Sequence, residues 1–162
     1  MIELMTIGYE GLSAKEFFEI LKRCRVETLV DVRELPISRK KGFSKSALIE
    51  STGKHGLNYQ HLQTLGCPRD IRHDYRDDND WKDYTKKFNK YLNDQKATMA
   101  ELARLVMQSR CCLLCFEEDY NFCHRLFVAQ RLASFVDDNL KISHLTGPIQ
   151  GRVVVMSAAA AA

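Results

Sequence analysis

The stretch CCLLCFEEDYNFCHR, residues 111–125, decides the fold. Its first part, Cys111–Phe116, is a continuous apolar run, which is typical of a strand buried on both faces of a sheet. Acidic residues occupy positions 117–119, and Cys123 then opens an amphipathic segment, 122–136, with apolar residues at helical spacing. A buried strand, a polar turn and a helix in this order predict one unit of a parallel α/β sheet.

The flanking sequence repeats this alternation. A capping box at Ser13 begins one helix, Ser44 caps another that stops at Gly53, and apolar stripes predict two more over 81–94 and 97–109. Further short strands are predicted over residues 2–7, 27–32, 57–62 and 141–145, with a sixth or an edge strand over 152–156.

Residues 63–80 break the pattern. They mix charged residues with Gly66 and Pro68, and we predict a long loop. A loop of this length within a domain is usually functional or mobile. The aromatic residues that follow have helical spacing and are predicted to lie in the core. They are Trp81, Tyr84, Phe88 and Tyr91.

The predicted fold is a single Rossmann-like α/β domain. It has a mostly parallel sheet of about five strands with helices on both faces. A chain of 162 residues is long enough for one such domain, predicted over 1–156. The alanine-rich end, 157–162, is excluded as a tail or cloning remnant.

The composition excludes some classes of protein and favours one compartment. No apolar run is long enough to span a membrane, and the start of the chain lacks a secretory signal. The six cysteines are therefore expected as reduced thiols in a cytoplasmic protein. The net charge of +3 is too small to indicate nucleic-acid binding, which must rest on a local patch.

Polar side chains cluster just after the predicted strands. Ligands of open parallel sheets bind at the carboxyl ends of the strands, so these side chains are expected to converge. They are Tyr9 and Glu10, Asp31 and Arg33, Tyr59 and His61, and Cys115 with Glu117, Glu118 and Asp119.

The segment after the second strand, Asp31–Lys45, is rich in basic residues. Arginine can clamp a phosphate with two hydrogen bonds, and aromatic rings such as Phe43 and Tyr59 can stack on a base. The segment lacks the spacing of a phosphate-binding P-loop, and a solvated basic loop is the competing interpretation. The candidate phosphate or substrate ligands are Tyr9, Arg33, Ser38, Arg39, Lys40, Lys45, Tyr59 and Arg125.

The cysteines of the deciding stretch divide into core and site. Cys112 and Cys115 have the spacing of a redox pair, but side chains three positions apart on a strand point to opposite faces. A dithiol role for them is therefore disfavoured. Cys115 lies at the strand end, and Cys123 lies at a helix start, where the helix dipole favours a thiolate.

The acids and bases around these thiols allow several kinds of chemistry. They support a reactive Cys123, an anion site, or a proton-transfer pair of Glu117 and His124. In the competing structural interpretation, His124 and Arg125 pair with the acidic residues and fix the loop. The candidate catalytic residues are Asp31, His61, Cys115, Glu117, Cys123 and His124.

A metal ion is a further alternative. Cys115, Cys123 and His124 would supply ligands, and His61 would complete four. Adjacent residues rarely bind one zinc ion, and the usual spacing of zinc ligands is missing. No cofactor or metal ligand is therefore predicted.

Four motifs, TIGYEG, LVDVR followed by PxSR, YxHLxxLG and LCFExDxxxCHRxxVA, resemble the family named domain of unknown function 488. The resemblance runs in order from Thr6 to about Leu145. It implies a small α/β domain but no settled activity. The chain departs from the family at Tyr9, where many relatives have His. The implied shared positions are Gly8, Asp31, Arg33, Ser38, Arg39, Tyr59, His61, Leu65, Gly66, Cys115, Glu117, Cys123, His124 and Arg125.

The sequence favours an enzyme that acts on a nucleotide or nucleic acid, by hydrolysis at a phosphodiester or glycosidic bond. Phosphate would lie among Arg33, Arg39, Lys40 and Arg125, and Glu117 or a histidine would transfer protons. A non-catalytic nucleic-acid-binding or accessory module and a cysteine redox protein are the alternatives. The expected partner is a nucleotide or nucleic acid and not a membrane.

Overall fold

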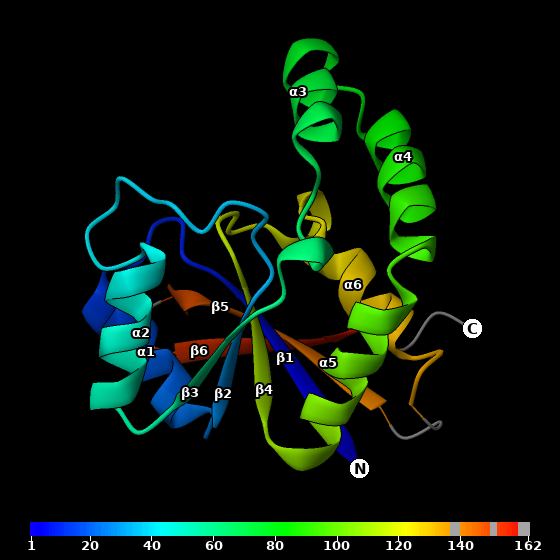
Figure 1. Ribbon diagram of the computed structural model, residues 1–162. Coiled ribbons are helices and arrows are strands. Elements are labelled where there is room, and N and C mark those ends of the chain that lie inside the picture. The colour runs from blue at the N-terminus through cyan, green and yellow to red at the C-terminus, as the bar shows by residue number, and fades with distance from the viewer. Residues whose placement is uncertain (137–139, 150–151, 159–162) are drawn as a thin grey trace.

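Cys111–Cys115 forms β4, a fully buried strand in the interior of the sheet. The computed structural model describes residues 1–136, 140–149 and 152–158. The sheet has the order β3-β2-β4-β1-β5-β6 (Figure 1). Its other strands are β1 Ile2–Gly8, β2 Thr28–Asp31, β3 Asn58–His61, β5 Leu140–Ile149 and β6 Arg152–Ala158.

Strands β1 to β5 pair in parallel, and β6 is antiparallel to β5 at the edge. The chain is thus an α/β protein with a single Rossmann-like sheet, as the alternating pattern predicted. The sixth strand includes Ser157 and Ala158, which overlap the predicted tail. The rest of that tail, 159–162, lies outside the described residues.

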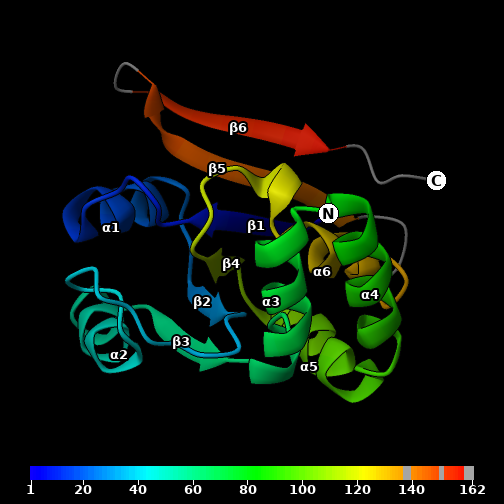
Figure 2. The same ribbon diagram turned by 90° about the horizontal axis from the view of Figure 1, so that it is seen from above.

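Helices cover both faces of the sheet (Figure 2). On one face, α1 (Ala14–Arg23) and α2 (Lys45–Lys54) bury Phe17 and Leu48 against the strands. The opposite face is covered by α4 (Trp81–Asn93), α5 (Lys96–Gln108) and α6 (Arg125–Leu132). Alternate residues of β4 enter the two cores, because successive strand side chains point to opposite faces. Cys111 and Leu113 lie in one core, and Cys112 and Leu114 lie in the other.

The predicted helix starts are confirmed by their hydrogen bonds. The backbone N–H of Glu16 donates to Ser13 Oγ at 3.2 Å, and the N–H of Ser13 donates to Glu16 Oε2 at 2.7 Å. This reciprocal pair is the capping box. Ser44 Oγ accepts from the N–H of Ala47 at 3.3 Å and caps α2.

The prediction of a long loop over residues 63–80 is wrong. A 3₁₀ helix, η1 (Gln63–Leu65), and a helix, α3 (Arg69–Asp78), occupy most of it. No residue of α3 is fully buried, and its apolar side chains are Ile71 and Tyr75, which pack against the core partly exposed. Its Tyr75 packs on Trp81 and Tyr84 of α4, and the two helices form an arm above the carboxyl ends of the strands (Figure 1).

The helix predicted over 122–136 is shorter than expected. A 3₁₀ helix, η2 (Tyr120–Phe122), precedes it, and α6 itself begins at Arg125. Cys123 and His124 therefore lie in the connection between the two helices. Among the described residues, no helix is long and apolar enough to cross a membrane.

Two glycines let the loops at the carboxyl edge approach one another. A Cβ atom on Gly8 would lie 1.7 Å from the carbonyl oxygen of Glu117, and one on Gly66 would lie 2.1 Å from the backbone nitrogen of Glu34. Both distances are far below contact, and both obstacles are backbone atoms that cannot rotate away. The end of β1 therefore fixes the position of Glu117.

We predict that Gly8→Ala destabilises the protein by about 1–3 kcal/mol, the usual effect of overpacking. The matched control is Gly53→Ala in α2, where an added Cβ meets no atom within 4 Å. That change should be neutral or stabilising, because alanine favours a helix. Urea unfolding measures both. Equal stability of the two variants would contradict the close approach of Gly8 to Glu117.

Candidate functional site

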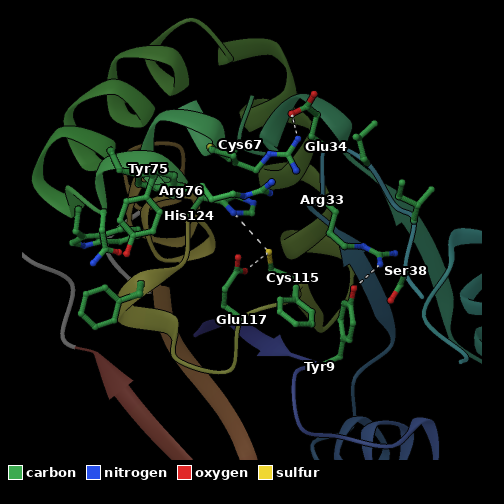
Figure 3. A pocket seen from close by; sticks show the side chains of 18 residues that line it. Tyr9, Arg33, Glu34, Ser38, Cys67, Tyr75, Arg76, Cys115, Glu117 and His124 are labelled. Atoms are coloured by element: carbon green, nitrogen blue, oxygen red, sulfur yellow. Dashed lines mark hydrogen bonds and ion pairs between the residues drawn. The ribbon is translucent and has the colours of Figure 1, made fainter. Parts of the chain in front are cut away.

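A cavity of about 670 Å³ opens at the carboxyl edge of the sheet, beneath the α3–α4 arm (Figure 3). Tyr9 reaches it from the end of β1, Arg33 from the end of β2, and Cys115 from the end of β4. Parallel strands bring these residues to one edge, although they are far apart in the sequence. The convergence predicted from the sequence is therefore present for these three strands.

The arm supplies the outer wall of the cavity. Tyr75, Arg72 and Arg76 come from α3, and Trp81 and Tyr84 come from α4. Trp81 stacks on Tyr84 with the ring centroids 4.6 Å apart. The sequence predicted a loop for the α3 residues, which is wrong. Its core prediction for the α4 rings is confirmed for Tyr84 and Phe88, while Trp81 and Tyr91 pack against the core partly exposed. The Ile71/Tyr75 spacing and the position of Pro68 before the helix are the signals that could have identified this wall.

Exposed apolar side chains gather at the rim of the cavity. Among the described residues, seven large apolar side chains are exposed, and four of them line this cavity. Grouped apolar exposure marks a binding surface, whereas single exposed residues are ordinary. The four are Leu35, Ile37, Phe116 and Phe122.

Four polar side chains form a tight cluster at the floor, which we call the thiol cluster: Cys115, Glu117, Cys123 and His124. Glu117 Oε2 accepts from Cys115 Sγ at 3.1 Å and from Cys123 Sγ at 3.3 Å. His124 Nδ1 lies 3.7 Å from Cys115 Sγ and 3.9 Å from Cys123 Sγ. Cys123 and His124 are buried, while Cys115, Glu117 and His124 line the cavity.

The orientation of the His124 ring is set from outside the thiol cluster. Its Nε2 lies 2.8 Å from the carbonyl oxygen of Val32 and must donate to it. In a neutral imidazole, Nδ1 therefore carries the lone pair, and this nitrogen faces both sulfurs. His124 thus presents an acceptor or metal ligand to the thiols, or a proton when it is charged.

The environment shifts the pKa values of the thiol cluster in opposite directions. Burial and negative charge on Cys123 raise the pKa of Glu117. Burial opposes charge on Cys123, but the hydrogen bond from Cys115 and the positive charges of His124 and Arg125 bring its pKa well below the usual value. The pKa of Cys115 is raised by its bond to Cys123 and by burial.

Arg125 does not line the cavity. It is fully buried, and its guanidinium donates to the carbonyl oxygens of Glu117 at 2.5 Å and Glu118 at 3.2 Å, and to Thr6 Oγ1 at 3.2 Å. The predicted role as a phosphate ligand is not favoured by this burial. Arg125 instead holds the backbone turn that carries Glu117.

Asp31 and Arg33 form a buried ion pair beside the cavity. Arg33 Nε and Nη2 donate to the two carboxylate oxygens of Asp31 at 2.9 and 2.7 Å. Tyr59 donates to Asp31 at 2.6 Å, and Arg33 also donates to the hydroxyl of Tyr9 and the carbonyl of Phe43. Asp31 and Tyr59 thus position Arg33, which alone of these three reaches the cavity.

The remaining predicted residues lie away from the thiol cluster. Ser38 lines the cavity, but Lys40 donates to the carbonyl of Tyr9, and Arg39 and Lys45 are exposed to solvent. His61 lies 2.8 Å from the carbonyl oxygen of Arg33 and 3.4 Å from Lys45 Nζ.

His61 and His124 lie on opposite sides of the chain after β2. Their carbonyl partners, Arg33 and Val32, are adjacent, and adjacent carbonyls of an extended chain point in opposite directions. His61 therefore faces the β3 side, and His124 faces the β4 side. The metal alternative that used His61 as a fourth ligand is not supported by this geometry.

We predict that Arg33→Met lowers the free energy of unfolding by about 3–5 kcal/mol, because it leaves the buried carboxylate of Asp31 without a positively charged partner. The double variant Asp31→Asn/Arg33→Met should recover part of this loss. Arg39→Met, an exposed change in the same loop, is the control. Chemical unfolding of the unaltered protein and the three variants measures the effect. Equal stability of Arg33→Met and Arg39→Met would contradict the ion pair.

Comparison with protein-family models matches residues 13–132 to the domain of unknown function DUF488. No significant match was found among curated proteins or solved structures. The matched region covers most of the chain, and it contains the Asp31–Arg33 pair, the α3–α4 arm and the thiol cluster. The chain therefore belongs to the DUF488 family.

Proposed function

We propose that the protein is an enzyme that acts on a nucleotide, either free or as part of a nucleic acid. One observation carries this proposal: a single cavity combines aromatic rings, guanidinium groups and a buried acid–base cluster. Rings stack on bases, guanidinium groups bind phosphate, and acids and bases move protons. The cavity volume of about 670 Å³ lies within the range of small-molecule sites.

The phosphate is best placed near α3. Arg76 is exposed and lines the cavity, and Arg72 lines it while paired with Glu34 at 3.2 Å. Both carry charge that a phosphate can use without breaking a buried pair. Arg33, in contrast, is already neutralised by Asp31. We therefore assign the phosphate contacts to Arg72 and Arg76, with Arg33 beside them.

The base is placed against the exposed rings. Phe116 and Phe122 are about half exposed, at 45% and 53%, so each presents a ring to a ligand in the cavity. Stacking of a base on an aromatic ring contributes about 1–3 kcal/mol and does not depend on which base is bound. This favours recognition of a nucleotide without strong sequence preference.

The chemistry is assigned to Glu117. Burial and negative charge on Cys123 raise the pKa of Glu117, and a carboxyl that holds its proton more tightly than usual suits a general acid. In hydrolysis of either bond class, water attacks the phosphorus or the sugar carbon, and the acid protonates the departing oxygen or base. His124 lies on the other side of the thiols from Glu117, and it can return a proton to Glu117 after the reaction.

A non-catalytic nucleic-acid-binding module is the second candidate. It is favoured by the exposed basic side chains of the Asp31–Lys45 segment, including Arg39 and Lys45. Binding there would be dominated by charge and would fall steeply with salt. For either function we propose a cytoplasmic setting, which suits six free cysteines.

Fluorescence of Trp81 tests the proposed binding mode directly. Trp81 is the single tryptophan and lines the cavity. We predict that nucleoside monophosphates or short single-stranded oligonucleotides change its emission on titration. Arg76→Ala should weaken binding by about ten- to hundredfold, the effect of losing one charged hydrogen bond.

The matched control for this titration is Arg104→Ala, the same change at an exposed position of α5. It should bind like the unaltered protein. Equal loss in both variants would show non-specific charge attraction, and loss confined to Arg39→Ala and Lys45→Ala would favour the binding module.

We further predict that Glu117→Gln abolishes turnover while it leaves Trp81 titration nearly unchanged. Glutamine keeps the size of the side chain but cannot donate an acid proton. Screening with nucleotide, nucleoside and oligonucleotide substrates measures the activity. Turnover that persists in this variant would remove Glu117 from the mechanism.

A further inference from the structure

We propose that the thiol cluster is a zinc site in which Cys115, Cys123 and His124 bind the ion, and the fourth position is open with Glu117 beside it. The three ligand atoms of Cys115, Cys123 and His124 all lie within 4.8 Å of one another. Glu117 Oε2 approaches both sulfurs more closely than that. This inference does not depend on the substrate proposed above.

The distances from His124 Nδ1 to the two sulfurs match the edges of a zinc tetrahedron. Zinc bonds of about 2.3 Å to sulfur and about 2.0 Å to nitrogen or oxygen give edges of roughly 3.3–3.8 Å. The two sulfur–nitrogen distances are 3.7 and 3.9 Å. Both are within about half an ångström of the required edge, so only small side-chain rotations are needed. Glu117 Oε2 lies 3.1 and 3.3 Å from the two sulfurs, but it does not belong to the set of ligand atoms that all lie within 4.8 Å of one another.

The surroundings hold the donors in place. Nε2 of His124 donates to the carbonyl of Val32, which leaves Nδ1 free to bind the ion. Such an outer hydrogen bond fixes the ring and its tautomer in most zinc sites. Arg125 fixes the backbone of Glu117, and Cys115 is held at the end of β4. The site is therefore formed before the ion arrives.

The donor set selects the kind of ion. Two thiolates and an imidazole favour zinc over magnesium or calcium, which prefer oxygen ligands. Cys123 and His124 are adjacent in sequence, which argues against a shared ion from spacing alone. In the folded chain, however, Sγ of Cys123 and Nδ1 of His124 lie 3.9 Å apart and both approach Cys115.

Zinc binds both cysteines as thiolates, so any proton that they still carry would leave for solvent. Two of the three donors, Cys115 and His124, also line the cavity. A ligand in the cavity would therefore meet the ion directly, as in catalytic zinc sites, where one position is open to water or substrate. Glu117 would lie beside this open position and would not be a ligand.

A disulfide between Cys115 and Cys123 is the main competing state, because the two sulfurs are neighbours. The zinc and disulfide states exclude each other. Bound zinc makes both thiols unreactive toward thiol reagents without oxidising them, and they become reactive again when a chelator removes the ion. A disulfide frees no thiols on chelation and requires a reductant.

The test is metal analysis of the full-length protein, purified with reductant, incubated with excess zinc and desalted. We expect one zinc per chain, and release of the ion by a chelator should expose two thiols. Replacement by Co²⁺ should give the intense visible absorption of tetrahedral cobalt and thiolate charge-transfer bands. These spectra are read on the unaltered protein, so they do not depend on whether a variant folds.

Variants locate the ion. Cys123→Ser and Cys115→Ser should reduce the bound zinc to below about a tenth of an equivalent, and Glu117→Gln should weaken binding by about ten- to hundredfold. The control is Cys24→Ser, a partly exposed thiol at the end of α1, which should retain full stoichiometry.

Two results would overturn the proposal. One is a reduced protein that binds no stoichiometric zinc and gives no tetrahedral cobalt spectrum. The other is zinc that remains after loss of Cys123 but disappears after loss of Cys24. Turnover that persists in Glu117→Gln while the unaltered protein binds one zinc would contradict the proposed function alone, and so the two proposals fail separately.

Discussion

The buried guanidinium of Arg125 organises the carboxyl edge of the sheet. It joins the carbonyl oxygens of Glu117 and Glu118 to Thr6 of β1, so the turn after β4 is tied to the neighbouring strand. Gly8 allows this approach, because any side chain at that position would overlap Glu117. A buried cation also needs negative charge nearby. The thiol cluster supplies it, since Arg125 helps to lower the pKa of Cys123.

The site is built from two halves with different constraints. The floor is rigid: Asp31, Arg33 and the thiol cluster apart from Glu117 are buried, and they are bound to one another or to backbone carbonyls. The outer wall is the α3–α4 arm, in which α3 has no buried residue and is held through Tyr75. A rigid floor suits chemistry, and a lightly held wall suits ligand entry. This division follows from where the apolar residues lie.

The strands and most helices could be predicted because they show strong local signals. The unbroken apolar run of β4 and the capping box at Ser13 both require no knowledge of distant residues. α3 was missed because its charged residues face solvent and it buries none of them. Polar helices of this kind are defined by their neighbours more than by their own sequence.

The candidate site was predictable in location but not in its contacts. Acids, thiols and bases after strand ends indicate a carboxyl-edge site. The separation of His61 from His124 depends on the direction of two carbonyl groups, which no spacing reveals. The burial of Arg125 and the meeting of Cys115 with Cys123 likewise depend on a folded turn. These contacts together form the cavity beneath the arm, and we expect the ligand to bind there.

The most direct test is amide chemical-shift mapping of the isotope-labelled protein during titration with a short single-stranded oligonucleotide. The predicted result is that the largest shifts fall in Arg69–Trp81 and in the segment from Cys115 to Arg125. Shifts confined to the basic segment near Lys45 and His61, with the arm unchanged, would contradict the account.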